Sequence, residues 1–166
     1  QQFLDKPEVF PDRKVLIDSE TDNYVIEYII YINEQPPGLP IDHVSTLENS
    51  FIYWEEKEFD TSDGKKAVAR FYVTDLKNEA NVWVTWVVRD LGEGVLGHAN
   101  LGKGVVEVAI GSYGCDGSFQ LFDVDTVEYI MTHELGHSLG LNHSTNTENI
   151  MYPNIPYSNY AYCLLN

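Results

Sequence analysis

Three histidines and a glutamate are concentrated in HELGHSLGLNH, residues 133–143, although the whole chain has only five histidines. On a helix, His133 and His137 lie one turn apart on the same face, so both imidazoles can bind one metal ion. Zinc binds imidazole nitrogen well, and a catalytic zinc keeps three protein ligands and an open fourth position. The pattern therefore predicts a zinc site that includes His133 and His137.

The third predicted ligand is His143, which follows His137 by six residues. A helix that continued straight would carry His143 to roughly the opposite side, so the chain has to leave the helix and turn back. Gly140 stands where this reversal is needed, and glycine accepts the positive φ of such a turn. We expect His143 to complete the zinc site by this route.

Glu134 is the predicted catalytic residue. It lies about 100° round the helix from His133, close to the open position without being a ligand. There it can act as general base on a zinc-bound water and then pass the proton to the leaving amine. The residues thus indicate a zinc-dependent hydrolase that cleaves peptide bonds.

Three other functions fit parts of the pattern. The first is a catalytically silent or latent zinc-containing module that binds peptides, and Glu134 argues against it because such a module needs no base. The second is a zinc hydrolase whose third ligand is a distant glutamate, and His143 in register argues against it. The third is a purely structural acidic domain, which leaves the histidine cluster unexplained.

The helix that carries the motif is expected to begin at Asp125 as N-cap. Glu128 follows three residues later, which is a capping-box pattern. Val127, Met131 and Leu135 form an apolar stripe that points away from the histidines, and the helix should end near Ser138. One face then packs on the core while the other faces a cleft.

The upstream sequence predicts an α+β fold, with a twisted mixed sheet of about five strands backed by two helices. An apolar stripe predicts the first helix within residues 41–59. A near-continuous apolar run at 24–32 predicts a strand covered on both faces. The other expected strands are 15–18, 67–73, 81–88 and 105–113, with a short strand inside the loop 89–104 and a loop at 114–122.

The chain is expected to form one domain, residues 1–166, with an irregular N-terminal extension at 1–14 and a separate tail at 144–166. Its 26 acidic and 10 basic residues give a net charge of −16, which argues against nucleic acid as a partner. No run approaches the ~20 apolar residues of a membrane span. We expect a monomer that acts on peptides or proteins.

The motif His-Glu-x-x-His-x-x-Gly-x-x-His resembles the zinc signature of the metzincin metallopeptidases. Eight residues after His143, Met151 in NIMYP resembles the Met-turn methionine of that clan, a hydrophobic floor beneath the zinc. Ser144 and the Met-Tyr-Pro sequence are similar to the matrixin branch, the matrix metalloproteinase type. The resemblance implies zinc ligands His133, His137 and His143, catalytic Glu134, and 144–166 as the Met-turn and tail.

The resemblance further implies a zinc-dependent endopeptidase that hydrolyses peptide bonds of extended polypeptides, and it implies where a substrate lies. GVLGHAN, residues 94–100, is similar to the edge strand that lines the matrixin cleft and pairs with an extended substrate. The residues implied to contact the substrate come from this strand and from the wall after the Met-turn: Gly97, His98, Ala99, Asn100, Tyr152, Pro153, Asn154 and Tyr157. A secreted or cell-surface location is implied as well.

Further ion sites and the cysteines are less defined by the sequence. A second, histidine-built zinc site is not expected, because only His43 and His98 remain. Five acids can hold calcium, although caps and turns explain most of them: Asp90, Glu93, Asp116, Asp123 and Asp125. Cys115 and Cys163 can form a disulfide or stay as buried thiols, and Cys163 can alternatively cap the zinc.

Overall fold

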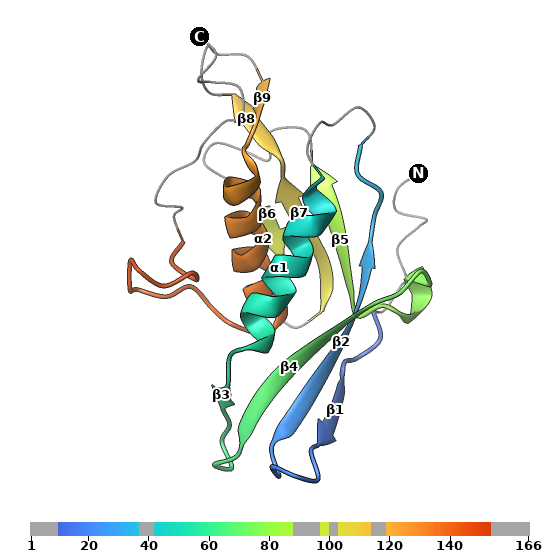
Figure 1. Cartoon of the computed structure of the whole chain (residues 1–166), viewed down its shortest axis with the longest axis vertical. Helices are drawn as coiled ribbons and strands as arrows, with labels where there is room; N and C mark the ends of the chain where they lie inside the picture. Colours follow the sequence, from blue (N-terminus) through green and yellow to red (C-terminus); the bar gives the residue numbers. More distant parts are fainter. Residues whose placement is uncertain (1–9, 37–41, 88–96, 100–102, 114–118, 154–166) are drawn as a thin grey trace.

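The computed structural model describes residues 10–36, 42–87, 97–99, 103–113 and 119–153. In these residues two helices cover one face of a mixed β-sheet (Figure 1). The helices are α1 (His43–Glu55) and α2 (Val124–Ser138). The strands are β1 (Lys14–Ile17), β2 (Tyr24–Ile32), β3 (Phe59–Asp60), β4 (Lys66–Val73), β5 (Val82–Val87), β6 (Gly97–Ala99), β7 (Gly104–Ala109), β8 (Gly111–Tyr113) and β9 (Phe119–Leu121).

The described strands of the main sheet follow the order β3-β4-β2-β5-β7-β6, and β1 pairs with β2. The neighbours β4, β2, β5 and β7 are parallel, whereas β6 runs antiparallel to β7. The predicted α+β class is confirmed, because β4-β2-β5-β7-β6 is the expected five-stranded mixed sheet. The short strands β1 and β3 extend it to seven.

The core lies between this sheet and the two helices. Leu47, Phe51 and Trp54 of α1 are buried there, as their spacing predicts. Val127, Met131 and Leu135 of α2 are each at most 1% exposed, so the expected core stripe of the second helix is confirmed. None of the nine residues of β2 is exposed, which agrees with a strand covered on both faces.

The start of α2 differs from the sequence prediction. Asp123, rather than Asp125, is the N-cap, and its Oδ1 accepts a hydrogen bond from the Thr126 amide at 2.9 Å. Asp125 lies in the first helical turn, where a carboxylate is favoured by the helix dipole. The capping-box interpretation of Asp125 and Glu128 was therefore wrong by two residues.

Two other segments also depart from expectation. The predicted strand 105–113 divides into β7 and β8, and part of the predicted loop 114–122 forms β9, which pairs antiparallel with β8.

At the other end of the chain, the described part of the N-terminal extension is irregular, and contacts with β5 and with the residue before it hold it in place. Phe10 packs edge-on against Trp83, and the side-chain Nδ2 of Asn81 donates to the Pro11 carbonyl at 2.8 Å. No helix in the described ranges is long and apolar enough to span a bilayer.

Candidate active site

The C-terminal end of α2 reverses the chain as the sequence predicts. The Gly140 amide donates to His137 O at 2.9 Å and the Leu141 amide to Gly136 O at 3.1 Å. This pair of bonds is a Schellman motif, which needs a left-handed residue after the helix. Gly140 supplies it, with φ at +97°. The helix thus stops after Ser138, and the chain returns toward the face that carries the histidines.

The reversal brings His133, His137 and His143 together. One ring nitrogen from each lies within 4.8 Å of the other two. His137 Nε2 and His143 Nε2 are 3.2 Å apart, and two ligands of a tetrahedral zinc at ~2.05 Å from the metal would be about 3.3 Å apart. The donor set and spacing therefore fit zinc. Among the described residues this is the single cluster of three metal-binding side chains.

Backbone carbonyls fix the orientation of two of these rings. His133 Nδ1 lies 2.7 Å from Ile150 O, and His137 Nδ1 lies 2.7 Å from Leu141 O. Because a carbonyl oxygen only accepts, each Nδ1 carries the hydrogen and each Nε2 keeps its lone pair for a metal. Burial lowers the pKa of His133 and of His137, so both rings favour the neutral form that binds metal.

Glu134 is buried beside this cluster, with 7% of its surface exposed. Burial raises the pKa of its carboxyl to about 7. Its side chain lies against Gly97 of β6, where a Cβ would come within 2.7 Å of Glu134 Oε2. A buried carboxyl with a pKa near neutrality is suited to accept and return a proton.

The Met-turn lies beneath α2. Met151 is 4% exposed, and its Sδ and Cε occupy the space that a side chain at Gly136 would need. The Asn149 side chain accepts from the Met151 amide at 2.8 Å, and the Ser144 amide donates to Met151 O at 2.8 Å. These bonds hold the loop after His143 against the helix, next to the Ile150 carbonyl that orients His133.

The predicted substrate-contacting residues are described only in part. Gly97 and Ala99 lie in β6, which pairs with β7 on one side only among the described strands. His98 lies in the same strand, Tyr152 is half-buried and Pro153 is exposed just after the Met-turn. Residues outside the described ranges are Asn100, Asn154, Tyr157, Cys115 and Cys163, so the disulfide stays a prediction.

The other candidate ion ligands have structural places. His43 is the first residue of α1 and is fully buried, so it is not available to a surface metal site. Asp123 caps α2 and Asp125 lies in its first turn. Asp90, Glu93 and Asp116 lie outside the described residues, and calcium binding stays a prediction.

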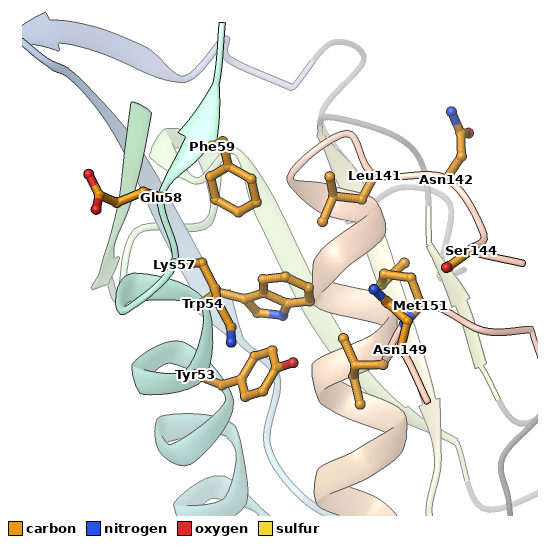
Figure 2. A pocket seen from close by; sticks show the side chains of 11 residues that line it. Tyr53, Trp54, Lys57, Glu58, Phe59, Leu141, Asn142, Ser144, Asn149 and Met151 are labelled. Atoms are coloured by element: carbon orange, nitrogen blue, oxygen red, sulfur yellow. The ribbon is translucent and has the colours of Figure 1, made fainter. Parts of the chain in front are cut away.

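Sequence reasoning missed the residues that support the site from behind. Trp54 of α1 donates a hydrogen bond from Nε1 to Thr132 O at 2.8 Å, beside His133. It also lines a pocket of about 400 Å³ between α1, β3 and the Met-turn, whose lining includes Phe59, Leu141 and Met151 but none of the three histidines (Figure 2). Trp54 was expected only as a core residue, and no spacing signal in the sequence links it to the histidines.

Comparisons with known proteins agree with this site. The profile of the Matrixin family, Peptidase_M10, matches residues 32–165. Stromelysin-1 from Equus caballus is 35% identical over 127 residues, which are 69% of this chain and 24% of that protein. Interstitial collagenase B from Mus musculus is 50% identical over 36 residues, 22% of this chain and 8% of that protein. The chain thus spans a quarter or less of the length of these relatives.

Among solved structures, the hatching enzyme zinc-protease high choriolytic enzyme 1 from Oryzias latipes (medaka fish) is similar over 77% of this chain and 48% of its own. Its TM-score is 0.44 at 20% identity. The three histidines, Glu134 and the Met-turn define a zinc-protease type of centre. With the family match over most of its length, the chain belongs to the matrixin family.

Proposed function

We propose that this domain is a zinc-dependent endopeptidase that cleaves extended polypeptides outside the cell or at its surface. The observation that carries the proposal is the placement of Glu134, buried between the histidine cluster and the edge strand β6. Zinc, when bound, supplies a Lewis acid that polarises a carbonyl and lowers the pKa of water. The membership of this chain in the matrixin family supports this chemistry.

The chain's own residues supply proton transfer and alignment. Glu134 Oε2 lies over one face of Gly97 in β6, so the carboxylate is close to the strand with which a substrate main chain would pair. It accepts the proton of the attacking water and donates it to the amine that leaves. The carbonyls of Ile150 and Leu141 hold two histidine rings in place throughout.

The substrate would pair with β6, which is formed by Gly97, His98 and Ala99, and Asn100, the next residue in the chain, would extend the contact. Tyr152, Pro153, Asn154 and Tyr157 would form the facing wall after the Met-turn. Main-chain pairing gives affinity for an extended segment with little dependence on its sequence, and the wall gives selectivity. A substrate strand on β6 would also cover a sheet edge that has no partner among the described strands.

The test compares the wild-type protein with Glu134→Gln and Glu134→Ala on a mixed peptide library, with cleavage read by mass spectrometry. Zinc content is measured on each protein. We expect cleavage to fall by at least about a hundredfold in both variants while zinc stays bound. Glu128→Gln on the same helix is the matched control, because its side chain contacts Asn49 of α1 rather than the metal cluster.

Two outcomes would favour a different function. A wild-type protein that holds zinc but cleaves nothing would indicate the silent or latent peptide-binding module. Cleavage that persists in Glu134→Gln would remove Glu134 from the mechanism.

A further inference from the structure

Three elements meet at Gly136, a residue of α2 between His133 and His137. A Cβ at this position would lie 2.7 Å from Trp54 Cζ2 of α1, and it would collide with Met151 of the Met-turn. The absence of a side chain therefore lets Trp54 and Met151 both reach the backbone of the zinc helix. Figure 2 shows the Trp54 indole extending from α1 toward α2.

Trp54 also holds the same helical turn by a hydrogen bond. Its Nε1 donates to Thr132 O at 2.8 Å, and the residue is 3% exposed. One turn earlier on α1, the hydroxyl of Ser50 lies 2.9 Å from that of Thr132. The stretch of α2 just before His133 is thus attached to α1 through buried polar groups.

On its other side, Trp54 adjoins the loop that orients His133. Met151 packs against Gly136 at the same point as the Trp54 ring, and both residues line the pocket of Figure 2. The residue before Met151 is Ile150, whose carbonyl accepts from His133 Nδ1. A shorter ring at position 54 would leave space where α1, α2 and the Met-turn meet, and the spacing between α2 and this carbonyl would then change.

We propose that Trp54 is a positioning residue of the zinc site. It sets the spacing between the turn that carries His133 and Glu134 and the Met-turn that orients His133, so zinc affinity and turnover depend on it. The inference rests on the proposed zinc-peptidase function, but it concerns the metal site and can be measured without a substrate. Groups that orient metal ligands change metal affinity by about 10–100-fold when they are replaced.

The experiment compares Trp54→Phe with Trp83→Phe. Trp83 is a matched control because it is 4% exposed and its Nε1 donates to a backbone carbonyl, Lys77 O, at 3.0 Å. By strand alternation its ring lies on the face of β5 opposite the helices, where it contacts Phe10 and Tyr31. Both substitutions shorten a buried ring and remove one indole hydrogen bond, and only one of them touches the zinc helix.

Four measurements are made on the wild type and both variants. They are the unfolding free energy of the metal-free protein, the zinc affinity by competition with a chromophoric chelator, the absorption spectrum of the Co²⁺-loaded protein, and kcat and KM for a cleaved peptide. We expect both variants to lose stability. Trp54→Phe alone should weaken zinc binding about tenfold or more, shift the Co²⁺ bands and lower kcat with little change in KM.

Equal zinc affinities and identical Co²⁺ spectra in the wild type and Trp54→Phe would overturn the proposal and leave Trp54 as a core residue. If Trp54→Phe does not fold, Gly136→Ala tests the same contact from the helix. Its methyl group would separate Trp54 and Met151 from α2, and unchanged zinc affinity there would also overturn the proposal. If the wild type binds zinc and cuts no peptide, the proposed function fails while the affinity comparison still decides the role of Trp54.

Discussion

At the scale of single residues, His43 is an imidazole buried in the protein interior. It is fully buried at the start of α1, and neither ring nitrogen has a hydrogen-bond partner among the described residues. Trp86 lies beside the ring, with centroids 6.0 Å apart. Burial lowers the pKa of His43, with the neighbouring Asp42 carboxylate acting in the opposite direction. The folded protein therefore keeps this ring neutral.

His43 should make the protein sensitive to acid. In the unfolded chain its pKa returns to about 6.5, so below that pH the unfolded state binds a proton that the folded state does not. Stability is then fully present above about pH 6.5 and falls at lower pH by at most about 1.4 kcal/mol per pH unit. We expect His43→Leu to reduce this loss, as measured by urea unfolding at about pH 7.5 and about pH 5.5. An unchanged difference between the two pH values would contradict the assignment.

Gly140 allows a second residue-scale prediction with an internal control. Gly140 and Gly64 both have positive φ, +97° and +86°, and a Cβ at either position meets no atom within 4 Å. Alanine at either site should cost about 1–2 kcal/mol, because an L side chain is strained in the left-handed region. Only Gly140→Ala should also weaken zinc binding, since it changes the reversal that delivers His143.

The measurement for this pair is zinc affinity and unfolding free energy on both variants. Equal zinc affinities for Gly140→Ala and Gly64→Ala would mean that the reversal has no influence on the site. A normal stability for Gly140→Ala would mean that the helix can end with a different turn.

At the scale of elements, the start of α2 depends on Asp123. Because its Oδ1 satisfies the Thr126 amide, Asp123→Ala should lower the unfolding free energy by about 1 kcal/mol. Asp125→Ala removes only a carboxylate from the first turn, which is worth a few tenths of a kcal/mol and fades in salt. Thermal or urea unfolding of the two variants separates these roles, and a larger loss for Asp125→Ala would restore the original capping-box interpretation.

The two-residue shift of this cap shows what local patterns can and cannot predict. Asp123 and Asp125 are both of a residue type that caps helices, and Glu128 three residues after Asp125 favoured Asp125, whereas Asp123 is the cap in the structure. The strand β9 was missed for a similar reason, because three residues opposite β8 gain their pairing from tertiary structure. The β2 strand was predicted with its observed bounds because eight of its nine residues are apolar or aromatic, with Glu27 as the one exception.

The sequence predicted the zinc ligands because all three of them lie in one short segment of the chain. The spacing of His133, His137, Gly140 and His143 is enough to fix ligands and reversal, because helix geometry and one left-handed glycine determine both. The groups that support the site were not predicted. The carbonyls of Leu141 and Ile150 carry no side-chain signal, and Trp54 lies about eighty residues earlier in the chain.

At the scale of the whole molecule, metal and fold should stabilise each other. The Ile150 carbonyl, the Leu141 carbonyl and the Schellman turn hold the histidines only in the folded chain, so zinc binds the folded state far better than the unfolded one. The unfolding free energy then rises by about 2.7 kcal/mol when free zinc exceeds its dissociation constant a hundredfold. A chelator should remove this increment and lower the melting temperature.

Two variants separate this linkage from catalysis. Glu134→Gln should keep the full zinc-induced rise in melting temperature, because Glu134 lies beside the metal position and is not one of the three ligands. His143→Ala should lose most of it, since only two imidazoles would remain. Calorimetry with and without zinc measures both shifts. If His143→Ala kept the wild-type shift, the zinc would be held elsewhere, and the reversal at Gly140 would have no part in coupling metal binding to folding.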